Sequence, residues 1–411
     1  MPPLRALARP SQAQVIARVV TLLLILPSIS LLFGLAAPLM TKRLPSAGLT
    51  GMVAPQRTQV RFTWDAWLSG DLQSGFDAWF ANNLGPARRI LVRLNNGIYY
   101  LAFHRSALDN ADIVIGKQRV LYQGTYVRDA CGKGGSLDTA RLERSLHAAS
   151  RALNDRRIAF AMAISPSKAA IYPEFIPAAH CTMLDTRRAY DQLVPLITAG
   201  DLPIIDGHAI TTALRAATPW PVFPRDGTHW NHLGALATVE ALIDTLEQQL
   251  GRRLVHLNLE RVDVDDHPTG SDADLGHLLN LPFPLRPYPT PHAVIGHDGG
   301  GRPIHVLFVG SSFLWIPIEI LMRNGVISDS TGYFYDNRIF RIGKDYRGDL
   351  EGLADISSAS AAADLAKRIN EVDAVVLEVN EAFLGDPYVV RFLGDIVRLS
   401  GSSQAAEPRI R

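Results

Sequence analysis

Short apolar segments alternate with amphipathic segments along most of the chain, and this alternation is what most limits its fold. The apolar segments lack polar alternation, as do strands buried on both faces of a parallel sheet. Leucines recur near the helical period over residues 233–250, and Asn231 stands where an N-cap belongs. The sequence therefore predicts an α/β fold, a central parallel sheet flanked by helices. The predicted strands are 112–116, 158–165, 202–206, 304–310 and 373–379, and the predicted helices are 137–155, 187–199, 233–250 and 358–370.

An uncharged segment near the N-terminus predicts a membrane anchor. Residues 19–40 carry no charge and are followed by Lys42 and Arg43. About 20 apolar residues cross a bilayer, and a cleaved signal core is usually shorter, about 7–15 residues. We expect one uncleaved transmembrane helix in the inner membrane, with the remaining chain in the periplasm. The small residues of 34–38 leave cleavage open.

Four regions follow from these patterns. Residues 1–44 form a cytoplasmic stub and the anchor, and 45–110 a tether with a helical segment. Residues 111–400 form the α/β domain, and 401–411 a loose tail. Within the domain, the acidic and proline-rich stretch 262–291 is expected to be a solvated loop, because its aspartates do not fit an EF-hand calcium loop.

Composition narrows the possible partners and cofactors. With 41 basic and 40 acidic residues, the chain has no net positive charge large enough to attract nucleic acid. Neither a dinucleotide fingerprint nor a phosphate loop is present, so no cofactor is expected. Cys131 and Cys181 exclude a multi-cysteine zinc site. They could form one disulfide outside the cytoplasm, and the spacing alone does not decide this.

A serine stands where the most apolar predicted strand ends. The segment Val309–Phe313 reads VGSSF, and a short helical stretch follows it. A tight turn there would expose the Ser312 hydroxyl. Backbone N–H groups of the turn, at Gly310, Ser311 and Phe313, could then stabilise an oxyanion. The alternative is that the two serines simply cap the helix.

An acid and an imidazole precede the predicted helix 233–250. Asp226 lies three residues before His229 in the segment RDGTHWNHLGA. A serine hydroxyl needs an adjacent base, and that base needs a group that orients it. We therefore predict that Ser312, His229 and Asp226 form a catalytic triad. The alternative, a metal held by Asp226, His229 and His232, lacks a supporting cluster elsewhere, so no metal is expected.

These motifs together resemble the SGNH hydrolase-like domain of the alginate O-acetyltransferases of the AlgX/AlgJ type. The resemblance rests on DGTHW, on VGSSF, on SPSKAAIYPEFIP at 165–177 and on DADLGHLLNLPF at 272–283, in the family's order. It implies a flavodoxin-like sheet with a permuted motif order, in which the acid–base pair precedes the serine. In well-known members one residue separates acid and histidine, whereas Gly227 and Thr228 do so here.

The resemblance implies an O-acetyltransferase that passes acetyl through an acyl-serine onto hydroxyls of an exported polysaccharide. It also implies two kinds of partner, a membrane-bound O-acyltransferase that relays acetyl and a polysaccharide secretion complex. A carbohydrate acetylesterase, or a non-catalytic scaffold of such a complex, remains the alternative. Polar residues near predicted strand ends are candidate substrate contacts, namely Lys168, Tyr172, Tyr333, Tyr335, Arg338 and Glu381.

Overall fold

A computed structural model describes residues 48–51, 62–83, 86–107, 112–181, 187–268, 270–334, 338–342, 354–355 and 358–404. The chain divides into two compact units. The first takes in residues 1–111 and 277–284, and the second takes in residues 112–276 and 285–411. Unit 1 therefore includes a short piece of the region 111–400 that was predicted to be one domain.

The second unit is built around a seven-stranded sheet with the strand order β10-β9-β8-β7-β11-β3-β4. Strands β8, β7, β11, β3 and β4 run parallel, and β9 and β10 continue the sheet in antiparallel pairing. The strands are β3 (Ala159–Ser165), β4 (Ile204–Asp206), β7 (Ile304–Gly310), β8 (Ile327–Phe334), β9 (Arg338–Ile342), β10 (Ala354–Asp355) and β11 (Ala374–Asn380). The predicted parallel sheet is thus confirmed, with β8, β9 and β10 in addition.

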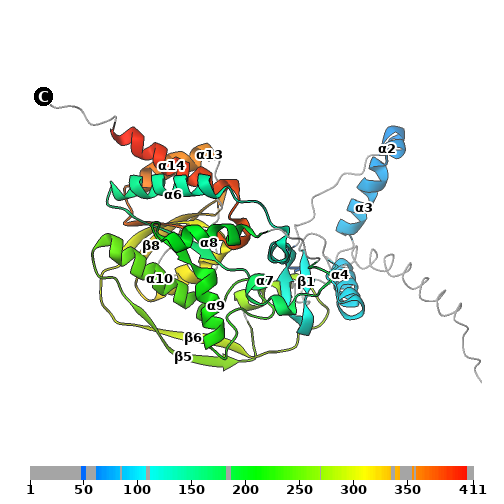
Figure 1. Cartoon of the computed structure of the whole chain (residues 1–411). Coiled ribbons are helices and arrows are strands. Elements are labelled where there is room, and N and C mark those ends of the chain that lie inside the picture. The colour runs from blue at the N-terminus through cyan, green and yellow to red at the C-terminus, as the bar shows by residue number, and fades with distance from the viewer. Residues whose placement is uncertain are drawn as a thin grey trace, which may run out of the picture. The chain divides into compact units, whose positions relative to one another are not determined.

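Helices cover both faces of this sheet (Figure 1). Alternate residues of β3 point to opposite faces, so that Ala161 packs in one core cluster and Phe160 in the other. The first cluster includes side chains of α10, α9 and α12, and the second includes those of α6, α8, α13 and α14. The helices are α5 (Gly124–Arg128), α6 (Thr139–Asn154), α7 (Lys168–Ile171), α8 (Ala189–Ala199), α9 (Gly207–Ala217), α10 (His232–Leu250), α12 (Trp315–Arg323), α13 (Ser358–Arg368) and α14 (Pro387–Gln404).

Two small antiparallel sheets differ from the sequence-based expectations. The predicted strand 112–116 forms β1 (Ile113–Ile115), which pairs with β2 (Leu121–Gln123) outside the large sheet. The stretch 262–291 is not a solvated loop throughout, because β5 (Leu257–Asp265) and β6 (Thr290–His297) pair across it. The β-branched valines of VDVD favour a strand, and acidity does not prevent pairing where, as in β5, most side chains are exposed.

Between these two hairpin strands lies a folded excursion. It contains a 3₁₀ turn at Gly270–Ala273 and the short helix α11 (Asp274–Leu278). In the second unit this excursion is tied to the loop before α10, because the Gly276 N–H donates to the carbonyl of Asp226 at 2.9 Å. The hairpin thereby carries an acidic segment back to the large sheet.

The first unit contains α2 (Trp64–Ser69), α3 (Asp71–Asn83) and α4 (Pro86–Ile98), as the predicted helical segment implied. Within this unit the Asn96 side chain donates to the carbonyl of Leu279 at 2.8 Å, and Tyr100 packs edge-on against Phe283. Over the described parts of the chain, no helix combines the length and apolar character that a membrane span needs. The predicted anchor at 19–40 lies outside the described residues.

A disulfide joins Cys131 and Cys181, as the sequence allowed for an exported domain. Helix α14 continues to Gln404, within the segment predicted to be a loose tail. Asn231 caps α10 as predicted, since its side chain accepts the Gly234 N–H at 2.8 Å.

Candidate active site

The candidate nucleophile lies on a turn between β7 and α12. The strand ends at Gly310, and a 3₁₀ turn over Ser312–Leu314 leads into the helix. A Cβ on Gly310 would come within 2.6–2.8 Å of Glu378 atoms, so the close approach of β7 to β11 requires glycine there. Ser311 caps the turn, as its hydroxyl accepts the Phe313 N–H at 3.2 Å. Ser312 itself is partly exposed and can be reached by a substrate.

The imidazole of His229 meets this serine across 83 residues of sequence. Its Nε2 lies 2.8 Å from Ser312 Oγ, which is hydrogen-bonding distance for proton transfer. The ring packs edge-on against Phe313 at 4.9 Å, and the neighbouring Trp230 donates its indole N–H to the Phe313 carbonyl at 3.2 Å. Aromatic packing thus fixes the base beside the hydroxyl. The structure thus brings Ser312 and His229 within hydrogen-bonding distance of each other.

The carboxylate that orients His229 is Asp274 rather than Asp226. Asp274 Oδ2 lies 3.0 Å from His229 Nδ1, so this nitrogen carries the proton and Nε2 is left to accept one from the serine. The other oxygen, Oδ1, accepts the Thr228 N–H at 2.8 Å and the Leu275 N–H at 2.6 Å. The acid therefore holds both the imidazole and the loop that carries it.

Asp226 has a different partner, and its predicted place in the triad is wrong. Both of its oxygens accept from the Arg225 guanidinium, at 3.1 and 3.2 Å. That guanidinium also stacks over the Tyr288 ring at 4.3 Å. Asp226 and His229 lie three residues apart in one loop, but their side chains have different partners. What Asp226 contributes is its backbone carbonyl, which accepts the Gly276 N–H two residues after Asp274.

The signal for Asp274 was in the sequence but could not be resolved there. It lies in the segment DADLGHLLNLPF that carried part of the family resemblance. Asp272 stands two residues away, and no spacing rule links either aspartate to a histidine 45 residues upstream.

The contacts of the two histidines do not favour the metal alternative. Both ring nitrogens of His229 contact other side chains, those of Asp274 and Ser312, and His232 lies 3.3 Å from Glu319. In the described residues, no cluster of three possible metal ligands occurs.

Two of the predicted oxyanion donors are already engaged. The Ser311 N–H donates to Glu378 at 2.6 Å, and the Phe313 N–H donates to the Ser311 hydroxyl. Gly310 belongs to β7, where its role is the close approach to β11. The Ser312 N–H has no acceptor among the described residues, so it is the donor that this turn offers to an oxyanion.

Lys168 is buried and supports the histidine loop, so the prediction that it contacts substrate is wrong. Its Nζ donates to the carbonyls of Pro224 at 2.9 Å and Arg225 at 3.1 Å, and also to that of Gly227. Burial lowers the pKa of Lys168 to about 7, and the nearby carboxylates of Asp274 and Asp226 partly oppose this shift. The ammonium group thus ties the end of β3 to the loop that leads to His229.

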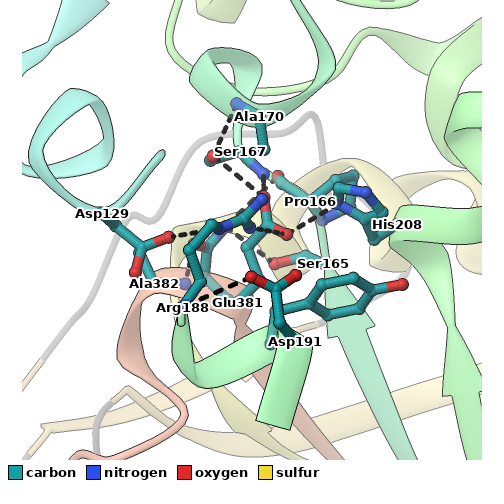
Figure 2. A network of polar contacts seen from close by, with 12 residues as sticks. Asp129, Ser165, Pro166, Ser167, Ala170, Arg188, Asp191, His208, Glu381 and Ala382 are labelled. Atoms are coloured by element: carbon teal, nitrogen blue, oxygen red, sulfur yellow. Dashed lines mark hydrogen bonds and ion pairs between the residues drawn. The ribbon is translucent and has the colours of Figure 1, made fainter. Parts of the chain in front are cut away.

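Glu381 lies in a buried network at the carboxyl ends of β11, β3 and β4. It was predicted as a candidate substrate contact, but its contacts are with buried groups of the protein. Figure 2 shows its carboxylate surrounded by donors. It accepts from the Ser167 N–H at 2.7 Å, from Arg188 at 2.6 Å and from His208 at 2.7 Å. Burial raises the pKa of Glu381, but the hydrogen bond from His208 and the charge of Arg188 outweigh burial and hold it below its ordinary value. Because Ser167 caps α7, the network fixes the helix that begins at Lys168.

Asp129 completes this network at its edge (Figure 2). Its carboxyl group is buried, and its Oδ2 lies 3.4 Å from Arg188 Nε without forming a hydrogen bond. Burial raises the pKa of Asp129 from 3.8 to about 6, and the charge of Arg188 only partly offsets this. Burial therefore disfavours the ionised form of Asp129.

This shift predicts a pH-dependent stability difference. Between about pH 4 and pH 6 the folded state binds more protons at Asp129 than the unfolded state, so stability is lost as pH rises through that window. Asp129→Asn cannot ionise at this position and so does not lose this stability. The unfolding free energy of the variant minus that of the native chain should therefore increase by on the order of 3 kcal/mol from pH 4 to pH 7. Urea unfolding at both pH values measures the difference, with the exposed Asp201→Asn as the matched control. Parallel pH curves for Asp129→Asn and the native chain would contradict the expectation.

The other predicted substrate contacts have mixed outcomes. Tyr333 on β8 is buried and donates to Asp364 at 2.7 Å, which gives it a structural role. The Tyr172 hydroxyl accepts the Val222 N–H at 3.1 Å, which also gives it a structural role. Arg338 is exposed on β9, and its role stays a prediction. Tyr335 lies outside the described residues.

Part of this chain is similar to a family of known proteins. Residues 113–293 match the family described as the SGNH hydrolase-like domain of acetyltransferase AlgX. The probable alginate O-acetylase AlgJ of Pseudomonas aeruginosa is 29% identical over 215 residues. That alignment covers 52% of this chain and 50% of AlgJ, so the chain spans about half the length of this relative.

Solved structures of the same two kinds of protein are also similar. The O-acetyltransferase domain of Pseudomonas putida AlgJ aligns with a TM-score of 0.40 at 16% identity, covering 70% of this chain and 98% of that domain. Pseudomonas aeruginosa AlgX aligns with a TM-score of 0.45 at 14% identity, covering 70% of this chain and 67% of AlgX. Over residues 113–293, this chain is therefore similar to the SGNH hydrolase-like domain of the AlgX/AlgJ proteins.

Proposed function

We propose that this protein is an O-acetyltransferase that carries acetyl on Ser312 and delivers it to hydroxyl groups of an exported polysaccharide. The observation that carries the proposal is the continuous hydrogen-bonded series from Asp274 through His229 to Ser312, with distances of 3.0 and 2.8 Å. Such a series turns an alcohol into a nucleophile at neutral pH. The similarity of residues 113–293 to the acetyltransferase domain of AlgX, and of about half of the chain to AlgJ, supports acetyl as the group transferred.

In the first half-reaction, His229 Nε2 accepts the Ser312 proton while Oγ forms a bond to the acetyl carbon of the donor ester. The tetrahedral oxyanion accepts a hydrogen bond from the Ser312 N–H. As the donor C–O bond breaks, the imidazolium returns the proton to the leaving oxygen, and acetyl-Ser312 remains. Asp274 stabilises the imidazolium without taking its proton.

In the second half-reaction a sugar hydroxyl replaces the donor. His229 removes the proton of that hydroxyl, the sugar oxygen attacks the acetyl carbon, and Ser312 leaves with the proton that the imidazole returns. The result is an acetylated sugar and a regenerated serine. If water attacked instead, the same groups would release acetate.

The setting of the reaction is part of the proposal. We infer a periplasmic domain held at the inner membrane by residues 19–40, beside a membrane-bound O-acyltransferase that supplies acetyl and a polysaccharide secretion complex. The Cys131–Cys181 disulfide agrees with an oxidising compartment outside the cytoplasm. Alginate is the first polymer to test, because AlgJ is described as a probable alginate O-acetylase.

Mass spectrometry after incubation with p-nitrophenyl acetate tests the proposal. We expect one added acetyl group on the peptide that contains Ser312, and none in Ser312→Ala. Addition of alginate oligosaccharide then discharges the serine into acetylated oligosaccharide.

A second Ser–His pair in the chain provides a matched control. Ser328 Oγ lies 3.3 Å from His305 Nδ1 on the exposed surface, and Ser328→Ala should leave the adduct intact. Acetylation that persists in Ser312→Ala would overturn the proposed nucleophile, and free acetate as the sole product would make the protein an esterase.

A further inference from the structure

A buried carboxyl group underlies the nucleophile turn. Glu378 lies on β11, between β7 and β3, and its residue is 2% exposed. Its Oε2 accepts the Ser311 N–H at 2.6 Å, and its Oε1 is hydrogen-bonded to the hydroxyl of Ser165. One side chain therefore connects the carboxyl ends of three adjacent strands directly beneath Ser312.

The surroundings of Glu378 differ from those of Glu381, three residues further along. Glu381 is paired with Arg188 and His208, whereas no ion pair with lysine, arginine or histidine involves Glu378 in the described part of the chain. The titratable groups near it are His229, whose charge when protonated opposes the rise in the pKa of Glu378, and Tyr388 on α14, whose hydroxyl donates to the backbone carbonyl of Glu378 at 3.2 Å.

Burial without a counter-ion favours the uncharged acid. Burial raises the pKa of Glu378, and the hydrogen bonds from Ser165 and Ser311 only partly offset the rise. The hydrogen-bond pattern fits a protonated carboxyl as well. Ser165 Oγ accepts from the Asn380 amide at 3.2 Å and has a further lone pair for a proton from Glu378.

We propose that Glu378 is a positioning residue that acts as a neutral carboxylic acid: its carbonyl oxygen holds the Ser311 N–H, and its O–H donates to Ser165. The inference rests on the proposed function. Negative charge develops on Ser312 Oγ and on the oxyanion during acylation, and an ionised Glu378 beneath the same turn would oppose it. The neutral acid fixes the turn without that repulsion.

The test compares two substitutions in the full chain. Glu378→Gln keeps a carbonyl acceptor for Ser311 and a donor for Ser165, so it should acylate at close to the native rate at neutral pH. Glu378→Leu removes both interactions and should lower the acylation rate by about 10²-fold, because the serine is no longer held in place. Single-turnover release of p-nitrophenol, corrected with Ser312→Ala, gives the rates.

The pH profile separates this role from a purely structural one. In the native chain the rate should decline at alkaline pH as Glu378 ionises, and in Glu378→Gln that decline should disappear. Glu240→Gln is the matched control, since burial also raises the pKa of Glu240 but this residue has no contact with the turn, and it should keep the native profile. An unchanged alkaline decline in Glu378→Gln would overturn the proposal, as would a loss of acylation in that variant at native thermal stability.

Infrared spectroscopy provides a readout that needs no activity. The native chain at neutral pH should show the carbonyl band of a protonated carboxylic acid, and this band should be missing in Glu378→Gln and present in Glu240→Gln. A native spectrum without the band overturns the neutral acid even if acylation proceeds. Conversely, a chain that shows the band but forms no acetyl-Ser312 refutes the proposed function and leaves the protonation state standing.

Discussion

Replacing Asp274 with asparagine is expected to lower the rate of acyl-serine formation on the order of 10⁴-fold. The N–H groups of Thr228 and Leu275 keep the amide oxygen at the Oδ1 position, so the amide NH2 faces His229 Nδ1 and donates to it. The imidazole then favours the tautomer with its proton on Nε2, facing Ser312. That nitrogen can then no longer accept the serine proton. Single-turnover acylation by p-nitrophenyl acetate measures the loss, and a melting curve confirms that the variant is folded.

The matched control is the same change at Asp226. Its oxygens contact Arg225 and not His229, so Asp226→Asn should retain most of the acylation rate while losing some stability from the ion pair. The contrast between the two aspartates decides which one is the acid of the triad. A deeper loss at Asp226 than at Asp274 would refute the assignment made from the contacts.

Glu381→Gln is expected to cause the largest loss of stability, about 3–5 kcal/mol in unfolding free energy. The change removes the buried charge that compensates Arg188 and weakens the acceptor that His208 contacts, while the desolvation cost of the arginine remains. It also weakens the acceptor of the Ser167 N–H, and so the start of α7. Urea unfolding at neutral pH measures the difference.

Glu174→Gln offers a comparison of the same chemistry at the surface. Glu174 pairs with Arg215, and both side chains are substantially exposed, at 44% and 34%. Exposed pairs contribute about 0–1 kcal/mol, so this variant should unfold close to the native midpoint. Equal losses from the two glutamates would mean that the buried network does not stabilise the fold.

The sequence was most informative where burial and periodicity act together. Strands β3, β7 and β11 are apolar on both faces, and only a parallel sheet covered by helices accommodates such segments. The strands β8 and β9, which lie next to the edge strand β10, do not stand out in the sequence, because residues such as Ser328, Asp329 and Ser330 interrupt the apolar pattern of β8. Pairing with neighbouring strands supplies the strand where local preference does not.

Prediction of the site succeeded for groups that local sequence can position. A serine after a strand and a histidine before a helix are both placed by their own elements, and they met as expected. The acid depends on how the β5–β6 excursion folds back, which local spacing does not encode. Lys168, Tyr333 and Glu381 were misassigned because a polar residue at a strand end can turn inward as readily as outward, and only the packing decides.

β5 and β6 bring the acid of the proposed triad to the site on a separate insert. Ser312 follows β7 of the large sheet and His229 precedes α10, whereas Asp274 lies on α11 between the two paired strands. Replacing that insert with another would therefore change the carboxylate and the surface around it at the same time. The position of the acid can thus change while the sheet and helices that hold Ser312 and His229 stay the same.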